Sequence, residues 1–250
     1  MYGPDVLNLD TLPWHPAVHR TPRPNRPTLI VIHDGETSES HQAAESMAAW
    51  FASGKTIGST QIVLDDDSIL RCVRDDEIAN GAAGANRWSL HIEIAGRASQ
   101  TSADWHDAFS QAAIRNAARV TAAWCKRYSI PARLLTVAEV RARTTPGICG
   151  HADVTAAFGV STHTDPGLSF PWAQFLQAVV EEMDMPLTEQ DITAITLHVV
   201  DALNKTLPAL VANAVMEKTD RDRAWMEDAD GTRKPGALYG AVRKFLRAQK

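Results

Sequence analysis

Short apolar segments mark the expected β-strands of this chain. Residues 29–32, Leu-Ile-Val-Ile, form the uninterrupted apolar run that is typical of a strand buried on both faces. Residues 90–95 alternate instead, so that the apolar side chains fall on one face and two polar ones, His91 and Glu93, fall on the other. Two further apolar segments flank the acidic turn Asp-Asp-Asp and predict a β-hairpin over residues 61–73.

Apolar residues at helical spacing predict helices between these strands. One is expected over residues 40–53, where Gly54 is placed to end it, and a longer one over residues 105–127. A third begins near Pro171, because proline is favoured in the first turn of a helix. Since helices and strands alternate along the chain, the sequence predicts an α/β fold.

Proline content and patterning divide the chain into three parts. Residues 1–27 carry six prolines, which predict an extended arm, and residues 28–183 hold the alternating strands and helices. A boundary is expected near residue 184. After it, Thr188 and Asp191 resemble a helix N-cap. We therefore expect residues 184–250, which end in a basic stretch, to form a small helical C-terminal region.

Composition narrows the classes of function. The 250 residues suffice for one full domain and a smaller appendage, and a net charge of −5 gives no reason to expect a nucleic-acid partner. No segment approaches the roughly 20 apolar residues that span a membrane, and the N-terminus does not have the pattern of a secretion signal. Three scattered cysteines do not make a disulfide framework, so synthesis in a reducing cytoplasm is expected.

Three motifs, IVIHD, GHADV and HTDPG, contain the candidate chemistry. Zinc hydrolases take three protein ligands from His, Asp or Glu and leave a position for water, and His33, His151 and Asp165 would make such a set. Each residue alone also has an ordinary interpretation. His33 could be a polar residue at a strand end, His151 a loop or helix-cap residue, and Asp165 the first residue of a Pro-Gly turn.

In their order along the chain, IVIHD, SLHIEIAG, GHADV and HTDPGLSFPW resemble the type 2 family of N-acetylmuramoyl-L-alanine amidases. That family includes phage endolysins, bacterial amidases and peptidoglycan recognition proteins, and the resemblance covers about residues 28–183. It implies a mixed central β-sheet flanked by helices. It also implies zinc-dependent cleavage of peptidoglycan at the amide between the lactyl group of N-acetylmuramic acid and L-alanine.

The resemblance assigns a role to each residue of the candidate site. His33, His151 and Asp165 match the three zinc ligands, and Glu93 matches the family's strand carboxylate, which could act as general base. His163 stands where many members have a catalytic lysine. Because histidine changes charge near neutral pH, it could stabilise the oxyanion and protonate the leaving amine. The structural alternatives are a strand carboxylate paired with a basic residue for Glu93, and a solvent-facing loop residue for His163.

The chain departs from the family pattern beside Glu93. His91 stands where the family strand has glycine, and it could be a partner of a metal ligand, a substrate contact or a substitute for part of the active site. A Tyr or His common on the second strand is replaced here by Thr60 and Gln61. The small residues of the loop 80–86 could border a substrate groove or form an ordinary surface loop.

These observations favour a phage endolysin, made in the cytoplasm without a signal peptide and acting on the bacterial wall after release. The alternative is a non-catalytic peptidoglycan-binding protein of the same fold, although such relatives typically lose the third ligand and Asp165 is present. A third hypothesis gives the main role to residues 184–250, as a wall-binding, host-interaction or homo-oligomerisation module.

Overall fold

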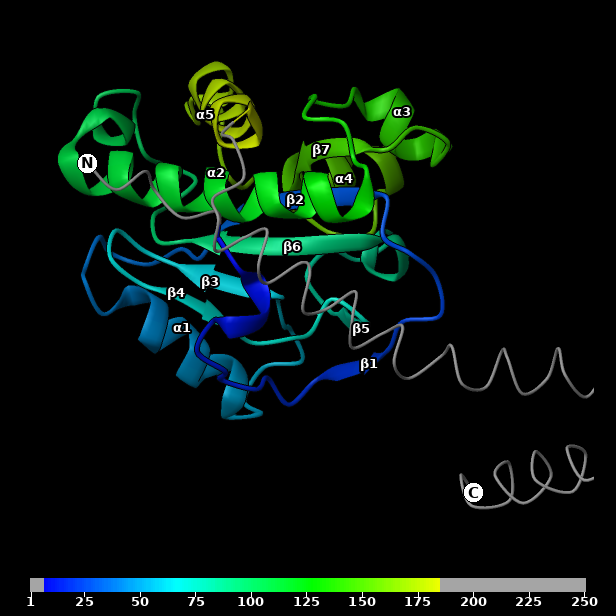
Figure 1. Ribbon diagram of the computed structural model, residues 1–250, viewed down its shortest axis with the longest axis horizontal. Helices are drawn as coiled ribbons and strands as arrows, with labels where there is room; N and C mark the ends of the chain where they lie inside the picture. The colour runs from blue at the N-terminus through cyan, green and yellow to red at the C-terminus, as the bar shows by residue number, and fades with distance from the viewer. Residues whose placement is uncertain (1–6, 185–250) are drawn as a thin grey trace, which may run out of the picture. The chain divides into compact units, whose positions relative to one another are not determined.

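A five-stranded β-sheet forms the centre of the computed structural model, which describes residues 7–184 (Figure 1). Its strands are β2 (Leu29–Asp34), β3 (Ile62–Leu64), β4 (Ile69–Arg71), β6 (Ser89–Ile94) and β7 (Gly147–Gly150). The strand order is β4-β3-β6-β2-β7, and only the β3–β4 pair of this sheet is antiparallel. The predicted mixed sheet and the predicted hairpin, formed by β3 and β4, are therefore confirmed.

The central strand β2 directs its side chains into two separate cores. All six of its residues are buried, as its unbroken apolar run predicts. Ile30 and Ile32 belong to one core cluster, whereas Leu29 and Val31 belong to a second one. Because successive side chains of a strand alternate, His33 points to the same side as Val31.

Helices cover both faces of the sheet. Within the described residues they are α1 (Ala43–Ala52), α2 (Ala108–Tyr128), α3 (Val137–Ala142), α4 (His151–Phe158) and α5 (Trp172–Asp184), with 3₁₀ turns at Leu9–Thr11, Asn86–Trp88 and Asp104–His106. The long helix α2 packs on α5, β6 and β3, while α1 lies against β3 and β4 on the opposite side (Figure 1). Beside them, α3 packs on α4, which contacts β7 and β2.

All three predicted helices are confirmed, but α1 and α2 each begin three residues after the expected start. The helix expected from Trp105 begins at Ala108, and Trp105 lies instead in a preceding 3₁₀ turn. The cause is Asp107, whose backbone is extended and whose side chain accepts a hydrogen bond from the Ser110 amide at 2.8 Å. An N-cap of this kind starts the helix at the next residue, although Trp105 is still fully buried in the core.

Several short elements escaped the sequence pattern. β7 has glycine at both ends and two apolar residues between them, which is too little alternation or length for a strand signal. The helix α3 has only six residues, and its sole sequence marker is the capping box formed by Thr136 and Glu139. A second, two-stranded sheet pairs β1 (Arg20–Pro22) with β5 (Glu77–Ala79). The two strands are more than fifty residues apart in the sequence, so no local pattern predicts that they pair.

The described part of the proline-rich arm, residues 7–27, packs against the rest of the domain. Leu9 and Ala17 are completely or almost completely buried. The backbone amides of His15 and Ala17 donate hydrogen bonds to the carbonyls of Arg71 and Cys72, each at 2.8 Å. Residues 15–17 of the arm are thus held along the end of β4.

The predicted helical region at residues 184–250 lies outside the described residues except for Asp184, the last residue of α5. The predicted N-cap at Thr188 and Asp191 is outside them as well. Among residues 7–184, no helix combines the length and the apolar character needed to cross a membrane.

Candidate functional site

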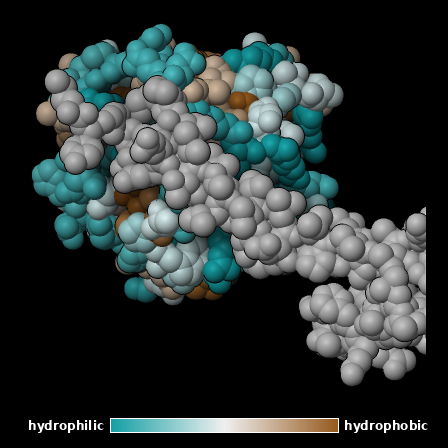
Figure 2. Space-filling view, viewed as in Figure 1, coloured by the Kyte–Doolittle hydropathy of each residue, from teal (hydrophilic) through white to brown (hydrophobic). Residues whose placement is uncertain are grey.

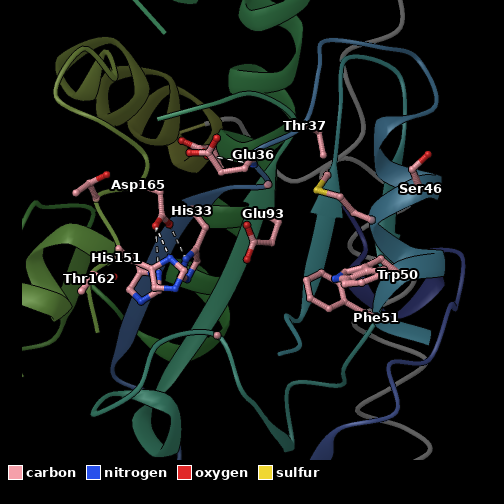
Figure 3. Close-up of a pocket in the computed structure, with 16 residues that line it drawn as sticks. His33, Glu36, Thr37, Ser46, Trp50, Phe51, Glu93, His151, Thr162 and Asp165 are labelled. Carbon is pink, nitrogen blue, oxygen red and sulfur yellow. Dashed lines mark hydrogen bonds and ion pairs between the residues drawn. The ribbon is translucent and has the colours of Figure 1, made fainter. Parts of the chain in front are cut away.

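A cavity of about 540 Å³ opens at the carboxyl ends of β2 and β6 (Figure 3). In α/β folds, ligands bind preferentially at such strand ends. The cavity is bounded by β2, β6, α1, the start of α4 and the turn at residues 162–165. It is lined by all five predicted site residues, His33, Glu93, His151, His163 and Asp165.

The structure brings together the three predicted metal ligands, although up to 132 residues separate them in sequence. His33 lies near the end of β2, His151 is the first residue of α4 directly after β7, and Asp165 lies in the turn that follows α4. The two Nδ1 atoms are 2.9 Å (His33) and 3.3 Å (His151) from the carboxylate of Asp165. One donor atom from each residue lies within 4.8 Å of the others, and all three residues are buried.

Backbone contacts place the Asp165 carboxylate beside the histidines. The Ala152 amide donates a hydrogen bond to the Asp165 carbonyl at 2.9 Å, and the Gly167 amide donates to Thr164 at 3.0 Å. Gly167 has a φ of +87°, and a Cβ there would collide with the backbone of Ala98. Only glycine adopts this tight turn against a neighbouring chain segment without strain.

The local electrostatics suit a cation. Burial alone would raise the pKa of Asp165, but the adjacent rings of His151 and His33 outweigh it and hold that pKa well below the usual range. Burial lowers the pKa of His33 despite its contact with Asp165, so its imidazole tends to be neutral. A neutral imidazole and an ionised carboxylate are the forms that ligate metals.

The donor set fits zinc. Two imidazole nitrogens and one carboxylate oxygen converge from three rigid elements, and the cavity leaves room for a further ligand. Among the described residues, the buried Nε2 atom of His151 has no hydrogen-bond partner.

Glu93 faces the same cavity from the neighbouring strand (Figure 3). It pairs in register with His33 across the parallel β2–β6 ladder, so both side chains project to the same side. Burial, followed by the negative charges of Asp165 and Asp34, raises the pKa of Glu93 well above its usual value. A carboxyl group that resists ionisation in this way is suited to holding and releasing a proton.

Asp34 is a third carboxyl group at the site, and the sequence interpretation did not single it out. It follows His33 as the last residue of the IVIHD motif, which was the available signal. Its Oδ1 accepts a hydrogen bond from the Glu36 amide at 3.2 Å, whereas its buried Oδ2 has no partner among the described residues. Burial and the charge of Asp165 raise the pKa of Asp34 to about 7.

His163 lies at the mouth of the site. Its ring stacks on that of His151, with centroids 4.2 Å apart and planes 14° from parallel. Its Nδ1 is 3.4 Å from the Asp165 carboxylate, yet 62% of its side chain is exposed. The residue therefore borders the buried ligands and also reaches solvent, where a substrate would arrive.

The far wall of the cavity is aromatic. Trp50 and Phe51 of α1 face the ligand cluster across the opening (Figure 3). Trp50 is half exposed, and it was missed because it lies off the apolar stripe of its helix. From the loop at residues 80–86, Gly81 lines the cavity. The face shown in Figure 2 is mostly hydrophilic with only small apolar areas.

An α/β domain with two histidines and an aspartate converging beside a carboxyl group at the strand ends has the construction of a metal-dependent hydrolase. The family model described as N-acetylmuramoyl-L-alanine amidase matches residues 23–168, and the chain belongs to this family. It is thus a member of the peptidoglycan amidases with a buried His-His-Asp candidate metal site.

Solved structures resemble this chain at low sequence identity. The hydrolase AmiA of Staphylococcus aureus, solved in complex with its ligand, is 18% identical, with a TM-score of 0.50 over 63% of this chain and 75% of that one. AmpD is 22% identical, with a TM-score of 0.48 over 72% of this chain and 99% of that one. An endolysin from Bacillus subtilis is 18% identical, with a TM-score of 0.45 over 68% and 98%. No curated protein sequence matches the chain significantly.

Proposed function

We propose that this protein is a zinc-dependent amidase that cleaves peptidoglycan between the lactyl group of N-acetylmuramic acid and L-alanine. The observation that carries the proposal is the convergence of His33, His151 and Asp165 in a cavity that Glu93 also lines. Family membership supports the substrate class.

His33, His151 and Asp165 would hold the zinc ion, the histidines through Nδ1 and the aspartate through its carboxylate. When bound, zinc polarises the scissile carbonyl and lowers the pKa of water towards neutrality. The protein positions the scissile bond between the ligand cluster and the aromatic wall formed by Trp50 and Phe51.

Glu93 acts as general base in this proposal. Its carboxylate takes the proton of the attacking water and retains it, because burial disfavours the charged form. A cation held by the three ligands would place positive charge nearby, which would lower the pKa of Glu93 and favour the carboxylate form that the first step requires. The same proton is then available for the leaving amine.

His163 stabilises the negative charge that develops on the carbonyl oxygen. Its exposed ring is held over His151, so one nitrogen can turn towards the substrate while the stacked face keeps its position. A hydrogen-bond donor held in advance where charge develops is worth roughly 10²–10³ in rate. His163 is also placed to deliver a proton to the amine, a role shared with Glu93.

Digestion of purified peptidoglycan tests the activity. The expected products are glycan strands without new reducing ends and stem peptides with a newly free N-terminal L-alanine, both identified by mass spectrometry. A chelator should abolish the release and zinc should restore it. New reducing ends, or cleavage within the stem peptide, would contradict the proposed bond, and wall binding without release would favour the non-catalytic alternative.

The ligand set is tested separately by metal analysis. Wild-type protein should contain about one zinc ion per chain, and His151→Ala should lose most of it because one of the three ligands is removed. Thr162→Ala, at the rim of the same cavity, is the matched control that should keep its zinc. Full zinc occupancy in His151→Ala would contradict the assignment.

A role as a phage endolysin is the narrower form of the proposal. Its support is the motif resemblance, which includes phage endolysins, and it places synthesis in the cytoplasm and action at the wall after release. Cells that produce the protein should stay intact until their membrane is permeabilised and then lyse rapidly. Lysis without permeabilisation would contradict this order of events.

A further inference from the structure

His91 lies directly behind the metal ligand His33, outside the cavity. It is completely buried, and it is not among the residues that line the opening. In the β2–β6 register His91 pairs with Val31, two positions before the His33–Glu93 pair. Its ring therefore points to the same side of the sheet as that of His33, and the two rings are in contact.

A continuous chain of hydrogen bonds joins His33 to a backbone carbonyl. His33 Nε2 is 3.1 Å from His91 Nδ1, and His91 Nε2 is 2.8 Å from the Ser89 hydroxyl. The Ser89 hydroxyl in turn donates to the carbonyl of Ala85 at 2.8 Å.

The Ala85 carbonyl at the end of this chain fixes which atom donates and which accepts in every bond before it. A carbonyl only accepts, so the single hydroxyl proton of Ser89 is used on Ala85, and Ser89 must accept from His91 Nε2–H. A neutral His91 then has a lone pair on Nδ1, which accepts from His33 Nε2–H. This leaves His33 with an unprotonated Nδ1, the atom 2.9 Å from the Asp165 carboxylate. A lone pair facing a carboxylate is unfavourable unless a cation lies between them.

We propose that His91 is a positioning residue that holds His33 in the tautomer whose Nδ1 is free to bind the metal, with Ser89 and Ala85 fixing the orientation of the chain. The inference rests on the proposed zinc centre and adds to it a residue that touches neither the metal nor the substrate. Partners behind a metal-bound histidine usually change metal affinity or activity by 10- to 100-fold.

The surroundings of His91 are shaped around its ring. The Gln61 side chain accepts from the His91 amide at 2.9 Å, and the Thr60 hydroxyl donates to its carbonyl at 2.9 Å. A Cβ on Gly81 would come within 2.6 Å of His91 Cγ and Nδ1. The ring therefore has one place to lie, and Gly81 is the residue that leaves room for it.

Two isosteric substitutions separate the hydrogen bond from the packing. His91→Asn keeps an acceptor oxygen near the position of Nδ1, whereas His91→Leu has the same size and no acceptor. Zinc affinity is measured on the full chain by competition with a chromophoric chelator. We expect His91→Leu to bind zinc about 10- to 100-fold more weakly and His91→Asn to stay at least several-fold closer to wild type. Ser89→Ala should weaken binding in the same direction by a smaller factor.

A spectroscopic readout keeps the test independent of activity. In zinc-loaded wild type, the His33 Nε2–H proton should be seen by NMR and exchange slowly with water, and in His91→Leu it should exchange fast. Equal zinc affinities for the Leu and Asn variants would overturn the role of His91 and leave the zinc centre intact. Wild-type protein without zinc would overturn the centre itself and this inference with it. If neither His91 variant folds, unchanged zinc affinity in Ser89→Ala overturns the proposal.

Discussion

Three carboxyl groups, those of Glu93, Asp34 and Asp165, lie close together at the strand ends, and the charge of Asp165 adds to burial in raising the pKa of the other two. Asp165 contacts His33 and His151 and remains ionised, whereas the other two resist ionisation. The protonation states differ because, of the three carboxyl groups, Asp165 is the one in contact with the two imidazole rings. A site with one fixed anion and two proton-holding acids is suited to a cation and to proton transfer.

Replacing Glu93 by Gln should lower the rate without removing the metal. Gln is the same size and cannot take a proton, so the turnover should fall by about 10²-fold or more. The measurement is the initial rate of peptide release by zinc-loaded protein at saturating peptidoglycan. Near-wild-type turnover in a zinc-loaded, folded Glu93→Gln variant would show that Glu93 is structural.

Asp34 predicts a pH dependence of stability in the metal-free protein. Its pKa is raised from 3.8 to about 7, so between these values the folded protein holds a proton that the unfolded chain has lost. The free energy of unfolding should therefore fall as the pH rises through this window, by an amount on the order of a few kcal/mol.

Asn cannot ionise, so the Asp34→Asn variant should not lose stability as the pH rises through this window. In urea unfolding from pH 4 to 8, the variant should gain stability over wild type as the pH rises, and the difference should level off above about pH 7. A difference between Asp34→Asn and wild type that is independent of pH would contradict the raised pKa.

At the scale of elements, the long helix α2 covers the face of the sheet that carries Ile30 and Ile32, away from His33. Its role is to support the sheet whose other face positions the ligands. Buried residues such as Trp124 fill the interface. Each large apolar side chain buried there contributes roughly 1.5–3 kcal/mol to folding. Changes to α2 should therefore alter stability more than chemistry.

Substitutions at Asp107, the N-cap of α2, test whether changes to this helix alter stability without altering catalysis. Asp107→Ala removes the acceptor for the Ser110 amide and should lower the free energy of unfolding by about 1 kcal/mol. Asp107→Asn, which caps almost equally well, is the matched control and should stay near wild type. Both variants should keep wild-type turnover. Equal loss of stability in Ala and Asn variants would contradict a capping role.

At the scale of the whole molecule, the family match and the cavity both fall before residue 184. The sequence prediction for residues 184–250 is a helical region with a basic end that attaches the enzyme to anionic wall polymers or to another copy. A chain ending at Met183 should therefore keep activity on small soluble muropeptides and lose it on intact walls, because tethering raises local substrate concentration without altering the chemistry.

The two substrates separate the alternatives for this region. Raised salt should weaken wall binding of the full chain if the basic residues act by charge. Sedimentation of the full chain as a monomer would exclude the homo-oligomer. Equal loss of activity on both substrates would show that residues 184–250 complete the catalytic fold, and no loss on either would exclude a targeting role.

Local patterns along the sequence were enough to predict the α/β class, the hairpin, three of the helices and the strand that carries His91 and Glu93. They succeeded because alternation and helical spacing report directly on which face of an element is buried. Motif order added the family and a candidate set of metal ligands that the structure brings together, since several weak signals in a fixed order are together specific.

Only the tertiary structure decided how these residues meet. Parallel pairing of β2 with β6 and β7 brings His33, Glu93 and His151 to one edge of the sheet, and such pairing joins segments that no local pattern relates. The same pairing puts His91 behind His33. The protonation states, the orientation of the predicted metal ligands and the donors and acceptors along the chain from His33 to Ala85 all depend on distances between strands. The sequence of a single strand does not contain those distances.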